Sequence, residues 1–310
     1  MNAVTQPIYA PFPWFGGKRT VAAEVWARLG KVANYVEPFL GSGAVLLARP
    51  DEPSIETVND CNHFLANLFR AIVADPASVA YHADYPITET DLQARHYWLV
   101  TEGAKRIEAC AGNTSHFDTQ VAGWWLWGAC AWIGSGWCSG EGPWSWDGGE
   151  WINRQMPHVG NAGQDRTAFI LKWLQDISSR LRHTRIACGD WSRVCGESVT
   201  WRHGTTGMFL DPPYGVQDRA TVYSHDCRDV AAQARAWAIA AGQRPDMRIA
   251  FAGYAGEHEF PADWDTWSWK AKGGYGSQGE GQGRENAGRE TIWFSPACAQ
   301  ERNKQAKLFF

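Results

Sequence analysis

Short apolar strands alternate with amphipathic helices along most of this 310-residue chain, and this alternation limits its possible folds more than any other feature. The clearest unit runs from a strand over residues 35–39 through a glycine turn into a helix that begins near Ala44. A strand over residues 55–59 and a helix over residues 64–72 follow directly. Tandem units of this kind favour a mainly parallel sheet covered by helices on both faces.

The same alternation returns in the second half of the chain, where apolar spacings of three and four mark the helices. The remaining predicted elements are helices over residues 20–29, 168–181 and 230–241 and strands over residues 185–188, 208–210, 247–252, 264–270 and 291–295. The last two strands are aromatic and joined by a glycine-rich loop, which is typical of a hairpin. We therefore predict an α/β fold with a Rossmann-like, mostly parallel sheet and an antiparallel C-terminal hairpin.

A segment rich in tryptophan and glycine interrupts this pattern. Eight of the 19 tryptophans lie between Trp124 and Trp151. These rings either form the core of a small domain with few aliphatic residues or include some that stack on nucleic-acid bases. We expect one domain made of residues 1–85 and 166–310, with residues 86–165 inserted into it.

Composition excludes several classes of protein. A net charge of −4 argues against a protein that coats nucleic acid by charge alone, so any such contact must be local. The eight cysteines form no C-x-x-C pair, the histidines form no metal-type cluster, and no uninterrupted apolar run reaches membrane-spanning length. We expect a cytoplasmic monomer or weak dimer with reduced thiols, no metal and no membrane contact.

The glycine turn after the first strand predicts a nucleotide-type cofactor site. Gly41, Ser42 and Gly43 stand where an open α/β sheet binds its ligand, and Asp60 ends the next strand, where an acid would bond ribose hydroxyls. The turn lacks the further glycines of dinucleotide and phosphate-binding loops. Glu37 before it would repel a pyrophosphate but would suit an ammonium or sulfonium group. This chemistry favours S-adenosylmethionine.

The sharpest motif is Asp211-Pro212-Pro213-Tyr214, directly after an apolar strand. An exocyclic amine is a poor nucleophile, so a catalyst must accept hydrogen bonds from its two hydrogens. The Asp211 carboxylate and the Pro212 carbonyl, fixed by the locked proline angles, offer two acceptors. Tyr214 offers a flat face for a base swung out of the duplex. The plain alternative is a turn in which Asp211 caps and the prolines end the strand.

Segments in the same order make the chain similar to the Dam-like family of adenine-N6 DNA methyltransferases. The residues that carry this resemblance are Trp14, Phe15, Gly16, Gly17, Lys18, Glu37, Pro38, Phe39, Gly41, Ser42, Gly43, Asn59, Asp60, Asp211, Pro212, Pro213 and Tyr214. The tail over residues 284–296 also resembles the closing hairpin of that family. The inserted region does not, so no target DNA sequence can be carried over.

The resemblance implies a class I methyltransferase sheet with a target-recognition insertion, acting on double-stranded DNA. Residues 14–18 and the glycine loop would hold S-adenosylmethionine, with Lys18 at the mouth of the active site. Asp60 would bind the ribose, and Asp190 with Trp191 would flank the cofactor adenine. Residues 211–214 would be catalytic.

Three readings remain open from the residues alone. The acceptor is adenine N6, or it is the cytosine amine or another exocyclic amine, or the chain is an inactive DNA-binding module. The glycine-rich loop over residues 273–288 is either a lid that brings Arg284 and Arg289 to DNA phosphates or a solvated hairpin connection.

Overall fold

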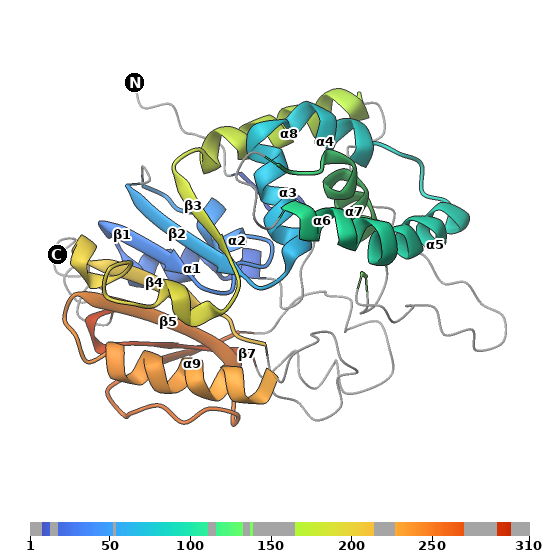
Figure 1. Ribbon diagram of the computed structural model, residues 1–310. Coiled ribbons are helices and arrows are strands. Elements are labelled where there is room, and N and C mark those ends of the chain that lie inside the picture. The colour runs from blue at the N-terminus through green and yellow to red at the C-terminus, as the bar shows by residue number, and fades with distance from the viewer. Residues whose placement is uncertain are drawn as a thin grey trace, which may run out of the picture. The chain divides into compact units, whose positions relative to one another are not determined.

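The computed structural model divides the chain into two compact units, one built on a sheet and one helical (Figure 1). The sheet unit comprises Trp14–Cys61, His183–Arg219 and His225–Phe310, and the helical unit comprises Met1–Pro13, Asn62–Arg182 and Ala220–Ser224. The structure describes residues 8–12, 18–51, 54–110, 116–132, 137–138, 165–213, 227–269 and 290–298. Each unit is described by itself.

A seven-stranded sheet in the order β3-β2-β1-β4-β5-β7-β6 forms the centre of the sheet unit (Figure 1). Its strands are β1 (Asn34–Glu37), β2 (Ile55–Asp60), β3 (Thr184–Cys188), β4 (Thr206–Leu210), β5 (Met247–Tyr254), β6 (Asp265–Ser268) and β7 (Glu290–Phe294). Strands β1 to β5 run parallel, and β7 is antiparallel to both β5 and β6. The predicted Rossmann-like sheet with an antiparallel C-terminal hairpin is confirmed.

Helices cover the sheet because successive strand residues point to opposite faces. The helical elements of this unit are α1 (Ala22–Leu29), α2 (Ala44–Leu47), α9 (Cys227–Ala241) and short 3-10 turns at Lys18–Thr20, Trp191–Val194 and Trp201–His203. Val36 and Met208 share a buried cluster with Ala234 of α9, which lies along β5 in Figure 1. Tyr35 instead packs on Trp26 of α1, with ring centroids 4.7 Å apart.

The strand order contains a switch point between β1 and β4, where the chain leaves the two adjacent strands toward opposite sides of the sheet. From β1 the chain proceeds outward to β2 and β3, then returns to β4 on the other side of β1. Asn34 of β1 is paired in register with Thr206 of β4, so the two strands end close together. In open α/β sheets the ligand binds at the carboxyl ends of the strands at such a switch point.

Five helices of the helical unit begin at capping residues. Its helices are α3 (His63–Ala74), α4 (Pro76–Ala83), α5 (Glu89–Trp98), a π-helical turn (Leu99–Gly103), α6 (Ala104–Cys110), α7 (Thr119–Ala131) and α8 (Arg166–Leu181). The side chains of Asn62, Asp75, Thr88, Asp118 and Asp165 each accept a hydrogen bond from a backbone N–H of the first helical turn. None of the helices described has the length and apolar character of a membrane span.

Part of the tryptophan-rich segment forms the interior of this unit. Trp125, Trp127 and Trp132 are at most 3% exposed. Helix α7 approaches α4 closely at Gly123, where a Cβ would lie 2.3 Å from the Cβ of His82. For these three rings the core interpretation of the cluster holds. The longest segment of the helical unit is Asn62–Arg182, whereas the recognition insertion predicted from sequence spans residues 86–165.

Candidate active site

The glycine loop after β1 and the acid at the end of β2 are joined by a direct hydrogen bond. Gly41 and Gly43 have φ values of 49° and 69°, which residues other than glycine rarely adopt. The backbone N–H of Gly41 donates to Oδ2 of Asp60 at 2.9 Å. The N–H of Leu40 donates to the carbonyl of Asn59 at 2.9 Å. The structure thus brings together the two parts of the cofactor site predicted from sequence, and Asp60 also holds the loop in place.

Asn59 links three strand ends, a role that sequence reasoning did not assign. Its side chain is fully buried, and its Nδ2 donates to the carbonyl of Pro38 at 3.1 Å and to that of Gly189 at 3.0 Å. These bonds tie the segments after β1 and β3 to the end of β2. A buried amide next to an acidic strand end was the available signal, but its partners are distant in sequence.

An aromatic pair lies beside the loop. Phe39, directly after β1, stacks on Trp191, with ring centroids 5.9 Å apart and planes 25° apart. Asp190 precedes this tryptophan, and its Oδ1 accepts a hydrogen bond from the N–H of Ser192 at 2.9 Å. Asp190 is exposed, while Trp191 is 7% exposed. The two residues predicted beside the cofactor adenine therefore follow β3 at the same edge of the sheet as the glycine loop.

Glu37, the last residue of β1, carries a buried carboxyl group. Its side chain accepts a hydrogen bond from the hydroxyl of Tyr35 at 2.9 Å, and the residue is 2% exposed. Burial raises the pKa of Glu37 well above its usual value, the bond from Tyr35 partly offsets this, and the negative charge of Asp211 raises it further. Because burial disfavours the charged form of this carboxyl group, a cation beside it would favour that form again.

Asp211 begins the segment that follows β4, next to the end of β1. Its Oδ1 lies 3.0 Å from Nζ of Lys18, and the same Nζ lies 3.8 Å from Oε2 of Glu290 at the start of β7. The exposed fractions of the Lys18, Asp211 and Glu290 side chains are 8%, 16% and 5%. Lys18 therefore lies at the predicted catalytic carboxylate. Glu290 was not predicted, because nothing in its local sequence marks it.

Pro212 and Pro213 follow Asp211 in the described part of the chain, at the carboxyl edge of the sheet. Several predicted site residues lie outside the described residues, namely Trp14, Phe15, Gly16, Gly17, Tyr214, Arg284 and Arg289. Apart from Lys18, the predicted catalytic and cofactor residues that are described lie at the ends of β1, β2, β3 and β4 or shortly after them, at one edge of the sheet. This edge offers carboxylates, a proline carbonyl and aromatic faces.

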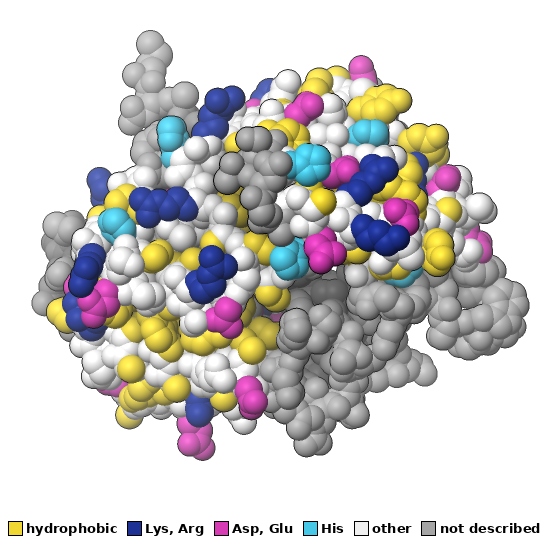
Figure 2. Space-filling view, viewed as in Figure 1, with side chains coloured by type: hydrophobic (Ala, Val, Ile, Leu, Met, Phe, Trp, Pro, Cys, Tyr) yellow, Lys and Arg dark blue, Asp and Glu magenta, His cyan; other side chains and the backbone are white. Residues whose placement is uncertain are grey.

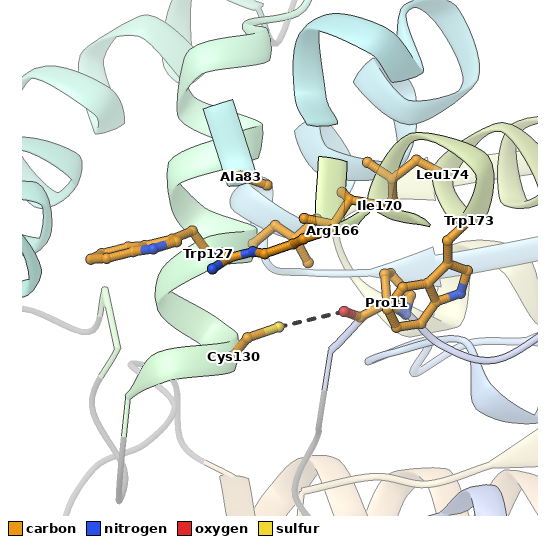
Figure 3. A pocket seen from close by; sticks show the side chains of 9 residues that line it. Pro11, Ala83, Trp127, Cys130, Arg166, Ile170, Trp173 and Leu174 are labelled. Atoms are coloured by element: carbon orange, nitrogen blue, oxygen red, sulfur yellow. Dashed lines mark hydrogen bonds between the residues drawn. The ribbon is translucent and has the colours of Figure 1, made fainter. Parts of the chain in front are cut away.

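The helical unit contains a pocket lined mainly by apolar and aromatic side chains (Figure 3). Trp127 and Cys130 of α7 and Trp173 of α8 line it together with Pro11. The thiol of Cys130 donates to the carbonyl of Pro11 at 3.5 Å, and burial raises the pKa of Cys130 to about 12. A thiol with so high a pKa is a poor nucleophile. Cys130 is therefore a poor candidate for a catalytic nucleophile.

Part of the chain resembles a known family of DNA methyltransferases. Residues 14–112 match the model of the D12 class N6 adenine-specific DNA methyltransferases. The match includes Lys18, the glycine loop and Asp60 and ends before Asp211. No curated protein matches the chain. Over residues 14–112, which make up less than half of its length, the chain is similar to the D12 class of N6 adenine-specific DNA methyltransferases.

Proposed function

We propose that the methyl donor is S-adenosylmethionine and that it binds where β1, β2 and β3 end. The residues present fit this group. Gly41 and Gly43 place no side chain against it, and the Asp60 carboxylate can accept bonds from the two ribose hydroxyls. Phe39 and Trp191 offer flat faces for the adenine ring, and Asp190 lies beside them. The buried carboxyl of Glu37 suits a positively charged group nearby.

The catalytic step that we propose takes place at the end of β4, the neighbour of β1. Asp211 and the carbonyl of Pro212 accept hydrogen bonds from the two N6 hydrogens of adenine, which draws the nitrogen toward tetrahedral geometry. When bound, S-adenosylmethionine would supply an electrophilic methyl group to that nitrogen, and its methyl–sulfur bond would break to leave a neutral thioether. The nitrogen then loses one proton, for which the Asp211 carboxylate is the nearest acceptor. Positioning carries most of the catalysis, because no covalent intermediate with the protein is needed.

The observation that carries this proposal is that neighbouring strands bring the two motifs to one edge. Asp211 lies near enough to Glu37 for its charge to raise the pKa of that acid. A plain turn at the end of β4 would not need a carboxylate beside the cofactor loop. We therefore favour the catalytic interpretation of residues 211–214, in which Tyr214 stacks on the flipped base.

The DNA partner that we propose is double-stranded, with one adenine swung out of the helix. On the face drawn in Figure 2, the described Lys and Arg side chains are scattered among acidic and uncharged ones. This distribution supports local phosphate contacts rather than a broad basic surface. We assign target recognition to the inserted region over residues 86–165. The cytoplasmic location, the monomeric or weakly dimeric state and the absence of a metal stay predictions from the sequence.

Labelled cofactor tests the proposal. The protein is incubated with DNA and S-adenosylmethionine that carries a tritiated methyl group, and the DNA is digested to nucleosides. We expect label in N6-methyladenine only. Label in N4-methylcytosine would refute the proposed acceptor, and a complete lack of label would refute the activity. Sequencing the methylated adenines of a genome that expresses the protein then identifies the target sequence.

Glu37→Gln should weaken cofactor binding without lowering the stability of the fold at high pH. Because the folded-state pKa lies above that of the unfolded chain, the neutral acid stabilises the fold at low pH, and this contribution is lost as the pH rises through the folded-state value. Glutamine stays neutral and can still accept the bond from Tyr35. At pH 8.5 the variant should melt at or above the wild-type temperature. Its cofactor dissociation constant should rise by about tenfold, the value of one lost charge-assisted bond.

Glu259→Gln is the matched control, because Glu259 is an exposed acid of the same unit. Differential scanning calorimetry at pH 5 and pH 8.5 and titration calorimetry with the cofactor give the two quantities. A variant that binds the cofactor as tightly as wild type would show that Glu37 does not face the bound cation.

A further inference from the structure

Lys18, Asp211 and Glu290 form a compact charged group, which we call the lysine bridge. One ammonium lies 3.0 Å from the carboxylate of Asp211 and 3.8 Å from that of Glu290. All three side chains are at least four-fifths buried, with exposed fractions of 8%, 16% and 5%. The ring of Trp269 also lies near the ammonium, with its centroid 5.9 Å from Nζ. The ammonium of Lys18 thus contacts two carboxylates in a largely buried place.

The backbone fixes Glu290 more firmly than it fixes the lysine. Glu290 is the first residue of β7 and is paired in register with Tyr254 of β5. Its carbonyl also accepts a hydrogen bond from the N–H of Trp269 at 3.1 Å. Lys18 begins a 3-10 turn and reaches the carboxylates through a flexible four-carbon side chain. The ammonium can therefore shift between two fixed acceptors.

The position of the ammonium matters for catalysis. While Lys18 bonds Oδ1 of Asp211, that oxygen is partly neutralised and is a weaker acceptor for the amino group of adenine. A shift of about 1 Å would turn the 3.8 Å contact with Glu290 into a charge-assisted hydrogen bond. The ammonium would then bond Glu290 in place of Oδ1 of Asp211, and this oxygen could accept a hydrogen bond from the base. The ammonium would still have an ionic partner.

We propose that Glu290 is a positioning residue that shares the ammonium of Lys18 with Asp211 and takes it over when the target adenine binds Asp211. This inference rests on the proposed catalytic role of Asp211. Glu290 touches neither the base nor the cofactor. It acts by keeping the carboxylate of Asp211 available while the charge of Lys18 stays compensated.

Removing the charge of Glu290 should slow the reaction without weakening cofactor binding. In Glu290→Gln the ammonium stays on Asp211, and we expect kcat to fall by about 10- to 100-fold, the worth of one charge-assisted bond in the transition state. The cofactor dissociation constant and KM should change by less than about threefold, because Glu290 does not contribute to binding of the cofactor or DNA in the ground state. A merely structural role would lower the melting temperature and leave kcat per folded molecule unchanged.

The double variant tests how the two residues depend on each other. Lys18→Met alone removes the ammonium that both buried carboxylates contact, a costly change, and should reduce kcat by at least about 100-fold. In Lys18→Met/Glu290→Gln a neutral amide replaces the second carboxylate, so kcat should rise at least about tenfold above that of Lys18→Met. Independent roles would instead make the double variant slower than either single variant.

The chain offers a matched control. Arg28 is likewise a buried cation shared by two carboxylates, Glu24 and Asp265, in the same unit. Asp265 is the first residue of β6 and pairs with Phe294, at the opposite end of β7 from Glu290. Asp265→Asn should leave kcat per folded molecule unchanged. Folded enzyme is counted from the stoichiometry of cofactor binding.

The outcomes separate this inference from the function on which it rests. A slow Glu290→Gln enzyme together with recovery in the double variant supports the lysine bridge. A wild-type kcat in Glu290→Gln, or a double variant no faster than Lys18→Met, overturns the role proposed for Glu290. If the Asp211→Asn enzyme is inactive in the same experiments, the proposed function still stands. An Asp211→Asn enzyme as fast as wild type would overturn the proposed function itself.

Discussion

Asp211→Asn is expected to lower the rate of methyl transfer by about 10³-fold, which is typical for loss of one preorganised electrostatic contact to a transition state. Asparagine has nearly the same shape but no negative charge, and its amide can present a donor where the base needs an acceptor. Cofactor affinity should stay within about threefold of wild type, because Asp211 bonds the base rather than the cofactor. Single-turnover rates with labelled cofactor and titration calorimetry measure the two effects.

Asp263→Asn provides the control, since Asp263 is an exposed aspartate in the turn before β6 of the same unit. It should transfer methyl groups at the wild-type rate. A transfer rate in Asp211→Asn within about tenfold of wild type would be too small a loss for an essential acceptor. Residues 211–214 would then be only a turn that ends β4.

Asp60→Asn is expected to raise the cofactor dissociation constant by about 10- to 100-fold, because charged acceptors contribute roughly 1.5–3 kcal/mol. The amide oxygen of asparagine can still accept the bond from the N–H of Gly41, so the glycine loop keeps its support. What is lost is an acceptor for a ribose hydroxyl. Asp60→Ala removes both contacts and should bind the cofactor still more weakly.

Asp246→Asn is the control for this series, because Asp246 precedes β5 at the opposite end of the sheet. Titration calorimetry with S-adenosylmethionine and with S-adenosylhomocysteine gives the affinities. Wild-type affinity in Asp60→Asn would remove Asp60 from the ribose site. It would then leave this residue with the single role of supporting the glycine loop.

Local patterns were sufficient for the sheet. Strands with short apolar repeats and the glycine turn after β1 follow from rules that act over a few residues. The first strand was predicted over residues 35–39 and ends at Glu37, because Pro38 has no N–H for the ladder. The individual helices α4 and α7 were not predicted. Helix α7 is apolar on nearly all sides and contains Gly123 and Gly128, so no amphipathic period marks it.

The site was predictable where a motif is contiguous. Gly41, Asp60 and Asp211 stand at strand ends, and the sequence alone indicated what each could bind. The bond between Asp60 and Gly41 and the bonds of Asn59 depend on which strands are neighbours. Glu290 is the clearest case, since it meets Lys18 only through the pairing of β7 with β5.

A crystal structure of the protein with S-adenosylhomocysteine and a duplex that contains the target sequence would test the central claim most directly. We expect a flipped adenine whose N6 lies about 3 Å from both the Asp211 carboxylate and the Pro212 carbonyl, with the ribose of the cofactor on Asp60. The account would be contradicted if N6 were bonded by other residues while the Asp211 carboxylate pointed away from the base.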